Sequence, residues 1–213
     1  MAAEPRPGTR AERRDRASAD TRARILEAAR SCLLADGYAN LSTRRVADAA
    51  DVPLSQIHYY FGSNQDLILA VLAAENERLL ARQASMYAGD EPIWRQWDRA
   101  CDFLEVDLES GYVRILQEMI AAGWSDATVA ASVRELLAGW FQLLTDVARR
   151  AEERSGGLGP FTAEEVATLM GLPFLGAESA ILLGIPESDL PTRSALRKIG
   201  TVLRDLGPTG KGE

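Results

Sequence analysis

The chain has 213 residues, of which 46% are hydrophobic and 26% charged, and its net charge is −7. This composition is ordinary for a folded protein with a sizeable core, and the negative charge argues against a protein that coats nucleic acid without specificity. The charge is uneven: residues 1–66 contain 10 arginines and 9 acidic residues, whereas residues 67–213 contain 14 basic and 22 acidic ones. This asymmetry indicates an N-terminal part that meets nucleic acid and a remainder with another purpose.

We expect neither export nor a membrane span. The two cysteines, Cys32 and Cys101, lack metal-ligand spacing and lie among apolar residues, which favours buried thiols in a reducing cytosol. The N-terminus lacks the apolar run of a signal peptide. The longest apolar stretch, 169–185, contains Pro173 and Glu178, so it predicts a buried helix. The predicted location is the cytoplasm, with no membrane partner.

The first 18 residues are rich in arginine and poor in large apolar side chains. They predict a disordered arm at 1–18, and the sequence leaves open whether this arm contacts DNA or is only a solvated tail. The first helix is predicted from about Asp20, which can act as N-cap, to Asp36. Gly37 follows and allows a left-handed C-terminal turn.

Helical periodicity continues along the rest of the chain. Separators rich in Gly, Pro, Ser and Asp divide it, and no strand-like alternation or internal repeat persists. The prediction is an all-α fold of about nine helices. After the first helix, the others are expected near 42–50, 54–60, 63 to beyond 80, 92–108, 111–122, 125–154, 162–185 and 192–206.

The segment 43–62 has the residue spacing of two short helices that cross over a tight turn. Ala47 is the small residue at the crossing, and Asp51 occupies the turn, where Asp tolerates a positive φ better than most residues other than Gly. Apolar residues at fixed offsets attach both helices to a core: Val46, Ala50, Val52, Ile57 and Phe61. This pattern predicts a helix-turn-helix.

The polar residues of the first short helix fall where contact with DNA requires them. Ser42 and Thr43 open the helix, where hydroxyls and free backbone N–H groups can bind a phosphate. Arg44 and Arg45 project from the same turn, and one of them can reach a guanine edge.

The second short helix begins with Leu54, Ser55 and Gln56, at the end that enters the major groove. Gln56 can pair with adenine and Leu54 can touch a thymine methyl group. Tyr59 and Tyr60 can donate their hydroxyls to phosphates.

The stretch GYANLSTRRVADAADVPLSQIHYYFGSNQDL resembles the N-terminal DNA-binding domain of the TetR family of regulators, and the resemblance covers about residues 20–75. The family pattern is roughly Gly-aromatic, Thr or Ser before a helix, Ile-Ala, Ala-Gly-Val, Leu-Tyr-x-His-Phe, and a Lys before a Leu. The places in this chain that match it are Gly37-Tyr38, Ser42, Val46-Ala47, Ala50-Asp51-Val52, Ile57-His58-Tyr59-Tyr60-Phe61 and Asp66-Leu67.

The resemblance implies that Ser42 and Thr43 contact phosphate and that Arg44 reads a base. It also implies a DNA-facing side of the second short helix, formed by Leu54, Ser55, Gln56, His58, Tyr59 and Tyr60. Three places depart from the family pattern. Asp51 replaces the turn glycine, His58 and Tyr60 replace the usual Tyr and His, and Asn64 replaces a phosphate-binding Lys, so that its contact would be weaker and uncharged.

For the rest of the chain the resemblance implies a helical domain that binds a small molecule and forms a homodimer. The expected domains are the arm at 1–18, the DNA-binding domain at 19–66 and the ligand-binding and dimerisation domain at 67–213. The candidate pocket residues are aromatic or Met, and each also fits an ordinary core. They are Trp94, Trp97, Phe103, Met119, Trp124, Trp140, Phe141, Met170 and Phe174. Trp124, Trp140 and Phe141 are favoured because they flank the long middle helix.

The helices at 162–185 and 192–206 are the expected dimer interface. Small residues let two helices approach closely, and apolar neighbours would be buried there. The small residues are Gly171, Gly176, Ala177, Ala180 and Gly184. A dimer also suits a palindromic operator, because each protomer reads one half-site.

The resulting hypothesis is a homodimeric, ligand-responsive repressor that binds a palindromic operator and is released by a small apolar effector. No cofactor, metal site or catalytic residue is expected. His58 is the only histidine, and no nucleophile with a third partner accompanies it. The competing hypothesis is a small all-α enzyme or ligand carrier with a vestigial helix-turn-helix. Specific DNA binding distinguishes the two.

Overall fold

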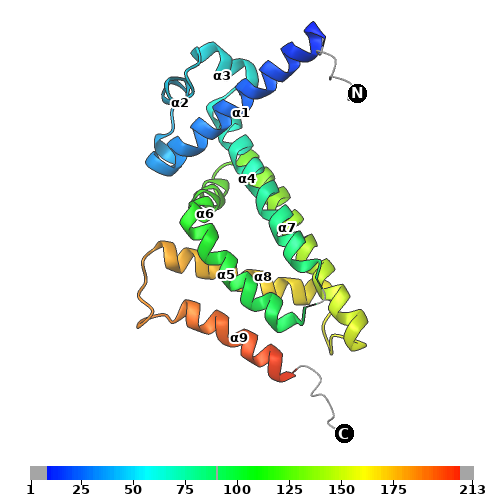
Figure 1. Cartoon of the computed structure of the whole chain (residues 1–213). Helices are drawn as coiled ribbons and strands as arrows, with labels where there is room; N and C mark the ends of the chain where they lie inside the picture. Colours follow the sequence, from blue (N-terminus) through cyan, green and yellow to red (C-terminus); the bar gives the residue numbers. More distant parts are fainter. Residues whose placement is uncertain (1–8, 90, 207–213) are drawn as a thin grey trace, which may run out of the picture. The chain divides into compact units, whose positions relative to one another are not determined.

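The computed structural model describes residues 9–89 and 91–206, and within these ranges every regular element is a helix (Figure 1). The all-α prediction is confirmed. The α-helices are α1 (Arg10–Asp36), α2 (Thr43–Ala50), α3 (Leu54–Phe61), α4 (Asn64–Tyr87), α5 (Ile93–Ser110), α6 (Tyr112–Gly123), α7 (Ala127–Ser155), α8 (Ala163–Leu182) and α9 (Thr192–Leu206). A short 3-10 turn, Tyr38–Asn40, joins α1 to α2.

The start of α1 corrects the predicted disordered arm, 1–18, over residues 10–18. The helix begins at Arg10, ten residues before Asp20, and residues 1–8 lie outside the described part of the chain. Thr9 is the N-cap: its hydroxyl accepts from the backbone N–H of Glu12 (3.3 Å), and the Glu12 carboxylate accepts from the backbone N–H of Thr9 (2.7 Å). This capping box is visible in the sequence as Thr9-x-x-Glu12. Residues 10–18 contain neither Gly nor Pro, so the helix continues unbroken.

The contacts within the chain divide it into two compact units, the first ending at Leu72 and the second beginning at Ala73. In the first unit α1 packs on α2, and α2 on α3. Their shared core is fully or nearly fully buried, and it consists of Ile25, Ala29, Cys32, Leu33, Val46, Ala47, Ala50, Ile57 and Phe61. Burial of these side chains is the main force that holds two eight-residue helices, which would not be stable alone.

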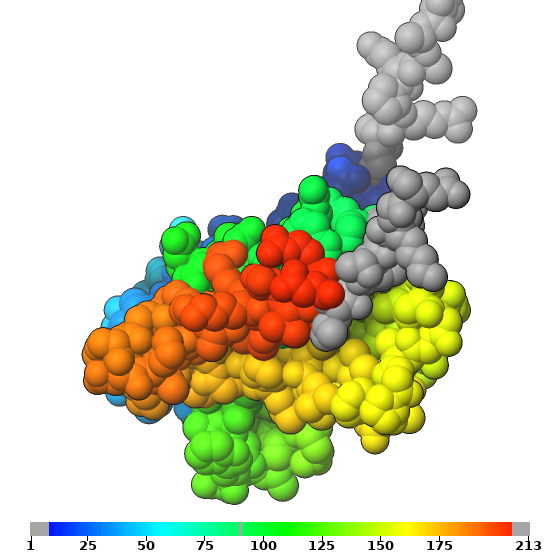
Figure 2. Space-filling model, turned by 90° about the horizontal axis from the view of Figure 1, so that it is seen from below, coloured from blue at the N-terminus to red at the C-terminus, as the bar shows by residue number. Residues whose placement is uncertain are grey.

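The second unit contains most of α4 and all of α5 to α9. One core cluster joins α5, α8 and α9 through Trp97, Phe174 and Leu196, and another joins α4, α7 and α8 around Tyr87 and Leu144. The indole N–H of Trp97 donates to the backbone carbonyl of Leu196 (2.7 Å), which fixes α5 against α9. Figure 2 shows α9 lying along α8 on one face of this unit.

Among the described helices only α8 is long and apolar enough, by length and composition alone, to cross a membrane. It packs against α7 and α9, which bury part of its apolar surface. A core helix of a globular protein meets the same criterion. Cys32 and Cys101 are free and buried, as predicted.

Candidate nucleic-acid interface and internal cavity

The turn between α2 and α3 has the geometry that the sequence predicts. Ser42 caps α2, with its hydroxyl accepting from the backbone N–H of Arg45 (3.2 Å). The helix ends at Asp51, which adopts a left-handed conformation (φ 51°, ψ 54°) and is the only described non-glycine residue with a positive φ. The backbone N–H of Val52 then donates to the carbonyl of Ala47 (3.0 Å), closing the helix end.

The two arginines of α2 differ in their environment. Arg44 is exposed, and among the described residues it makes no ion pair or side-chain hydrogen bond. Arg45 pairs with Asp36, the last residue of α1, at 2.9 Å. Arg44 is therefore free to reach a base or phosphate, whereas Arg45 ties α2 to α1. Thr43, beside them, is half-buried.

The first turn of α3 has no side-chain cap, because Pro53 occupies the N-cap position. Backbone N–H groups at this end are therefore available to an anion. Ser55 is exposed, and Leu54 and Gln56 are half-buried. The side-chain oxygen of Gln56 is buried without a hydrogen-bond partner among the described residues, so its amide must rotate outward before it can read a base.

The residues at the C-terminal end of α3 divide between the surface and the neighbouring helix. Tyr59 is 79% exposed, and His58 is exposed with its Nδ1 2.9 Å from the carbonyl oxygen of Gly62. A carbonyl only accepts, so Nδ1 is the donor in this hydrogen bond. The Tyr60 hydroxyl lies 3.0 Å from the Ser18 hydroxyl of α1, which makes Tyr60 a link between helices.

Asn64 does not present its amide group for a phosphate contact. Its Nδ2 donates to the backbone carbonyl of Leu41 (3.1 Å), and its Oδ1 is buried without a partner among the described residues. The side chain thus joins the start of α4 to the loop before α2. The sequence alone does not indicate this role, because Asn at a helix start fits either use.

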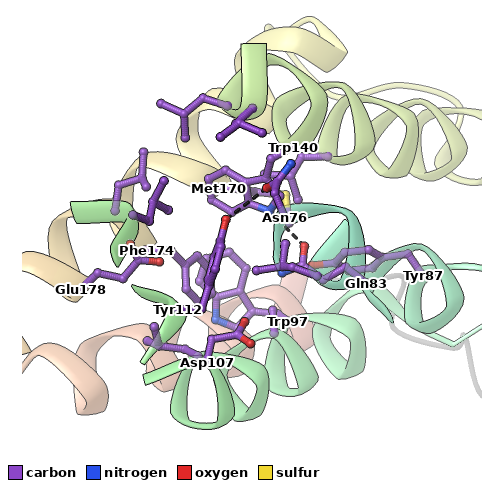
Figure 3. Close-up of a pocket in the computed structure, with 18 residues that line it drawn as sticks. Asn76, Gln83, Tyr87, Trp97, Asp107, Tyr112, Trp140, Met170, Phe174 and Glu178 are labelled. Atoms are coloured by element: carbon purple, nitrogen blue, oxygen red, sulfur yellow. Dashed lines mark hydrogen bonds between the residues drawn. The ribbon is translucent and has the colours of Figure 1, made fainter. Parts of the chain in front are cut away.

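A cavity lies inside the second unit, between α4, α5, α6, α7 and α8 (Figure 3). It contains about 730 Å³ of space that no atom occupies, part of it open to solvent. Its lining residues are Asn76, Leu79, Gln83, Tyr87, Trp97, Ala100, Leu104, Asp107, Tyr112, Leu116, Leu136, Leu137, Trp140, Leu144, Met170, Phe174, Leu175 and Glu178.

The structure brings together only some of the predicted pocket residues. Trp97, Trp140, Met170 and Phe174 line the cavity. Trp124, a favoured candidate, does not: it is 82% exposed, because it occupies the position just after α6, where the chain turns toward α7.

Four other predicted pocket residues also lie away from the cavity. The guanidinium groups of Arg95 and Arg204 cover Trp94, and that of Arg82 covers Phe103 at 5.0 Å from the ring centre. Met119 is fully buried in side-chain packing. Phe141 packs on Trp140 and fills the space beside Gly171, where an added Cβ would lie 2.6 Å from its ring.

Polar groups also line the cavity, and residue spacing in the sequence does not reveal them. Tyr112 donates its hydroxyl to the Asn76 side-chain oxygen (3.1 Å), and the Trp140 indole N–H donates to the Gln83 side-chain oxygen (2.9 Å), as dashed lines in Figure 3 mark. One sequence signal could have revealed a polar group of the cavity wall: an acidic residue within an apolar helical run, such as Glu178 within 169–185.

Two acidic residues of the cavity wall are buried, and burial raises the pKa of both carboxyl groups. The pKa of Glu178 rises from 4.5 to about 7, because burial outweighs a stabilising hydrogen bond from Gln117 and the nearby Asp107 adds repulsion. The pKa of Asp107 also rises, through burial, against the opposing effect of Arg82. Within the described residues, no group of His, Cys, Asp and Glu side chains is arranged to hold a metal ion.

A three-helix unit with two short helices across a tight turn, followed by a helical unit around a cavity, defines a helix-turn-helix regulator. Residues 25–71 match the model for bacterial regulatory proteins of the tetR family. An uncharacterised helix-turn-helix-type transcriptional regulator in the dhlA 5′ region of Xanthobacter autotrophicus is 30% identical over 177 residues, covering 78% of this chain and 81% of that protein. The chain belongs to the TetR family of transcriptional regulators.

Solved structures share the fold at low sequence identity. FadR from Bacillus subtilis, in complex with stearoyl-CoA, is 11% identical, with a TM-score of 0.70 over 84% of this chain and 96% of that one. A protein from Saccharomonospora viridis, in complex with choline, is 17% identical, with a TM-score of 0.70 over 89% of this chain and 97% of that one.

Proposed function

We propose that this protein is a cytoplasmic, homodimeric repressor that binds a palindromic operator and is released by a small, largely apolar effector held between α4 and α8. The observation that carries the proposal is that α2 and α3 bury one set of side chains and expose another. The apolar side chains of Val46, Ile57 and Phe61 are buried in the first unit, while Arg44 and Tyr59 are exposed and make no side-chain hydrogen bond or ion pair among the described residues. Exposed arginine and tyrosine at these positions suit base and phosphate contacts.

The proposed DNA contacts can be ranked by how free each side chain is. Arg44, Ser55 and Tyr59 come first because they are exposed. Thr43 and Leu54 come next because they are half-buried, together with His58, which contacts the Gly62 carbonyl. Gln56 contributes after its amide rotates. Ser42, Arg45, Tyr60 and Asn64 are engaged within the first unit, so they act mainly by positioning the helices.

The first half of α1 is a further source of phosphate contacts. Its arginines, exposed along the helix, are Arg10, Arg13, Arg14 and Arg16. The hydrogen bond between Ser18 and Tyr60 ties the following turn of α1 to α3, the helix proposed to enter the groove. Helical arginines near the recognition helix strengthen binding without adding sequence specificity.

An exposed apolar surface on α8 and α9 supports a dimer. Leu169, Leu172 and Val202 are each more than half exposed. Gly176 faces open space, since an added Cβ would have no neighbour within 4 Å, whereas Gly171 packs against Phe141 and is used within the chain. Exposed leucines beside a small residue would be covered when two protomers pack through these helices.

The cavity supplies the proposed effector site. The two structures of the same fold that hold stearoyl-CoA and choline support a ligand-binding role for this kind of unit. Asn76, Gln83 and Tyr87 of α4 line the cavity, and the same helix starts directly after the helix-turn-helix. An effector that fits one conformation of these residues better than another shifts the equilibrium by that difference in affinity.

A gel-shift assay on the DNA upstream of the protein's own coding sequence tests the proposal. The Arg44→Ala, Gln56→Ala double variant should weaken binding at least about 10-fold, since each good base contact contributes about 1–3 kcal/mol. Arg134→Ala, which removes an exposed arginine from α7, is the matched control and should bind like the wild type. Equally weak binding by wild type and double variant would favour the competing enzyme or carrier.

Sedimentation tests the dimer separately. A wild-type dimer at micromolar concentration should become a monomer in Leu172→Glu, because the charge would be buried in the proposed interface. A stable wild-type monomer would contradict the two-half-site mechanism.

A further inference from the structure

Two carboxylates lie in the wall of a largely apolar cavity. Asp107 of α5 is 6% exposed and Glu178 of α8 is 9% exposed, and both line the space between the helices. Buried carboxylates are costly unless they are paired with a cation or protonated. What each one contacts therefore indicates what the cavity can accept.

The two carboxylates differ in their partners. Asp107 forms an ion pair with Arg82, whose guanidinium also rests on the ring of Phe103. Glu178 accepts a hydrogen bond from the neutral amide of Gln117 (2.8 Å), and among the described residues no Lys or Arg forms an ion pair with it. Glu178 is thus a buried carboxylate without a compensating positive charge.

The amide of Gln117 is held in one orientation, so its interaction with Glu178 is specific. The Ser179 hydroxyl donates to the Gln117 side-chain oxygen (2.8 Å), which leaves the NH₂ group facing Glu178. This bond stabilises the carboxylate only partly: burial still raises the pKa of Glu178 to about 7. In the free protein near neutral pH, the carboxyl group is therefore divided between its charged and neutral forms.

Three neutral hydrogen-bond donors of the wall already have acceptors. The indole N–H groups of Trp97 and Trp140 donate to Leu196 and Gln83, and the Tyr112 hydroxyl donates to Asn76. A ligand that takes a hydrogen bond from one of these three donors must break the bond that the donor already makes. Glu178 is the group in the wall that gains most from a new partner.

Aromatic faces surround the same space. Trp97, Tyr112, Trp140 and Phe174 line the cavity, and Figure 3 shows Glu178 beside Phe174 and Tyr112. The rings of Trp97 and Phe174 are 5.2 Å apart between centres. Aromatic faces attract organic cations, most strongly where water is excluded.

We infer that the cavity binds an organic monocation, a protonated amine or quaternary ammonium with an apolar body, whose charge lies next to Glu178 and whose body lies among the aromatic rings. This inference rests on the proposed role of the cavity as the effector site, and it replaces a purely apolar effector with an amphipathic, cationic one. The ligand supplies the positive charge that the protein itself provides to Asp107 but not to Glu178.

Three probes that share one apolar body and differ in charge test the inference: phenylpropylammonium, phenylpropanol and phenylpropanoate. Their binding is followed by the fluorescence of the cavity tryptophans or by calorimetry. The ammonium should bind at least about 10-fold more tightly than the alcohol, as expected for a close buried charge pair, and the carboxylate most weakly. Equal affinities for ammonium and alcohol, or no binding of either, would overturn the inference.

Substitution of Glu178 tests the assigned residue. Glu178→Gln should reduce the affinity for the ammonium to that for the alcohol and leave the alcohol affinity within about 3-fold, which also shows that the variant is folded. Glu135→Gln removes an exposed carboxylate from α7 and should keep the preference for the ammonium. An unchanged preference in Glu178→Gln would exclude Glu178 as the partner.

Proton release gives a readout that needs no variant. The bound cation favours the charged form of Glu178, so ammonium binding to the wild type near pH 7 should release a fraction of a proton, and alcohol binding should release none. Calorimetry in two buffers with different ionisation enthalpies measures this release. Identical heats for the ammonium in both buffers would contradict the inference.

The failure of this inference can be told apart from the failure of the proposed function. A regulator that binds its operator but shows no preference for the ammonium has the proposed function and a different effector. If the cavity prefers the ammonium but the ammonium does not change operator binding, the cation site exists. The cavity is then not the effector site.

Discussion

The helix-turn-helix and the cavity are built in opposite ways. The helix-turn-helix takes its residues from one short segment, 42–61, and its proposed contact residues project outward from two adjacent helices. The cavity takes its wall from five helices, between Asn76 and Glu178, and its two carboxylates and the Tyr112 hydroxyl are hydrogen-bonded within the second unit. A motif formed by neighbours in sequence can be found from residue spacing, whereas a site formed by distant helices depends on how they pack.

The two regions should therefore respond differently to substitution. Changes at the exposed positions of α2 and α3 should alter DNA binding with little change in stability. Changes in the cavity wall should alter ligand binding and stability together, because those side chains also hold the helices in place.

The largest effect should come from Ile57→Ala, which removes a fully buried side chain from α3. Loss of a core Ile costs about 2–5 kcal/mol, so the first unit should unfold at much lower urea concentration. Tyr59→Ala on the same helix removes a side chain that is 79% exposed, and it should change stability by less than about 0.5 kcal/mol while weakening DNA binding. Circular dichroism measures the stability of the two variants, and gel shifts measure their DNA binding. Similar denaturation curves for the two variants would contradict the division of α3 into a buried and a DNA-facing side.

The next largest effect concerns the pH dependence of stability through Glu178. Its pKa is raised from 4.5 to about 7 on folding, so the folded state binds a proton more tightly than the unfolded state. The contribution of Glu178 to stability is then full below about pH 4.5 and is lost as pH rises through 7, on the order of 3 kcal/mol for this group. Glu178→Gln should remove this decline, so that the variant gains stability over the wild type at pH 8 and not at pH 4.

Urea denaturation at several pH values measures that difference. Asp107 shifts in the same direction and contributes to the overall curve, so the comparison of Glu178→Gln with the control Glu135→Gln isolates Glu178. Parallel curves for the two variants would show that Glu178 is not held in a buried, uncompensated state.

A smaller effect is expected from the basic half of α1. Replacing Arg10, Arg13, Arg14 and Arg16 together by Gln should weaken operator binding and reduce its salt dependence, by roughly 0.9 in the logarithmic slope for each phosphate that is no longer neutralised. Gln is about as good a helix former as Arg, so the helix should persist, and discrimination between operator and random DNA should stay the same. An unchanged salt slope would show that this helix is a solvated extension.

The smallest effect is expected at Ser42. Ser42→Ala removes the N-cap of α2 and should cost about 1 kcal/mol of stability as well as operator affinity. Ser42→Asp keeps a capping oxygen but places a negative charge near the phosphates, so it should keep stability and still lose affinity. Comparison of thermal melts with gel shifts separates the two roles; equal affinities for Ser42→Asp and the wild type would show that no phosphate lies near Ser42.

The sequence predicted most features that depend on interactions between near neighbours. The cap at Ser42, the left-handed Asp51 and the limits of α5 to α9 lie within a few residues of the predicted positions. The start of α1 also depends on near neighbours, the capping pair Thr9 and Glu12. It was missed because the pair lies in a segment whose arginine-rich composition predicted disorder.

The tertiary structure alone decided which side chains form the cavity. Trp97 and Trp124 were both candidates for the pocket, yet one is buried in the cavity wall and the other is 82% exposed. The packing of α5 on α8 and α9 encloses Trp97, and the turn after α6 leaves Trp124 outside. The same holds for Asn64, whose amide turns toward Leu41. Capping, turns and helical periodicity are fixed within a few residues of chain. The direction in which a side chain finally points depends on helices brought together from far apart.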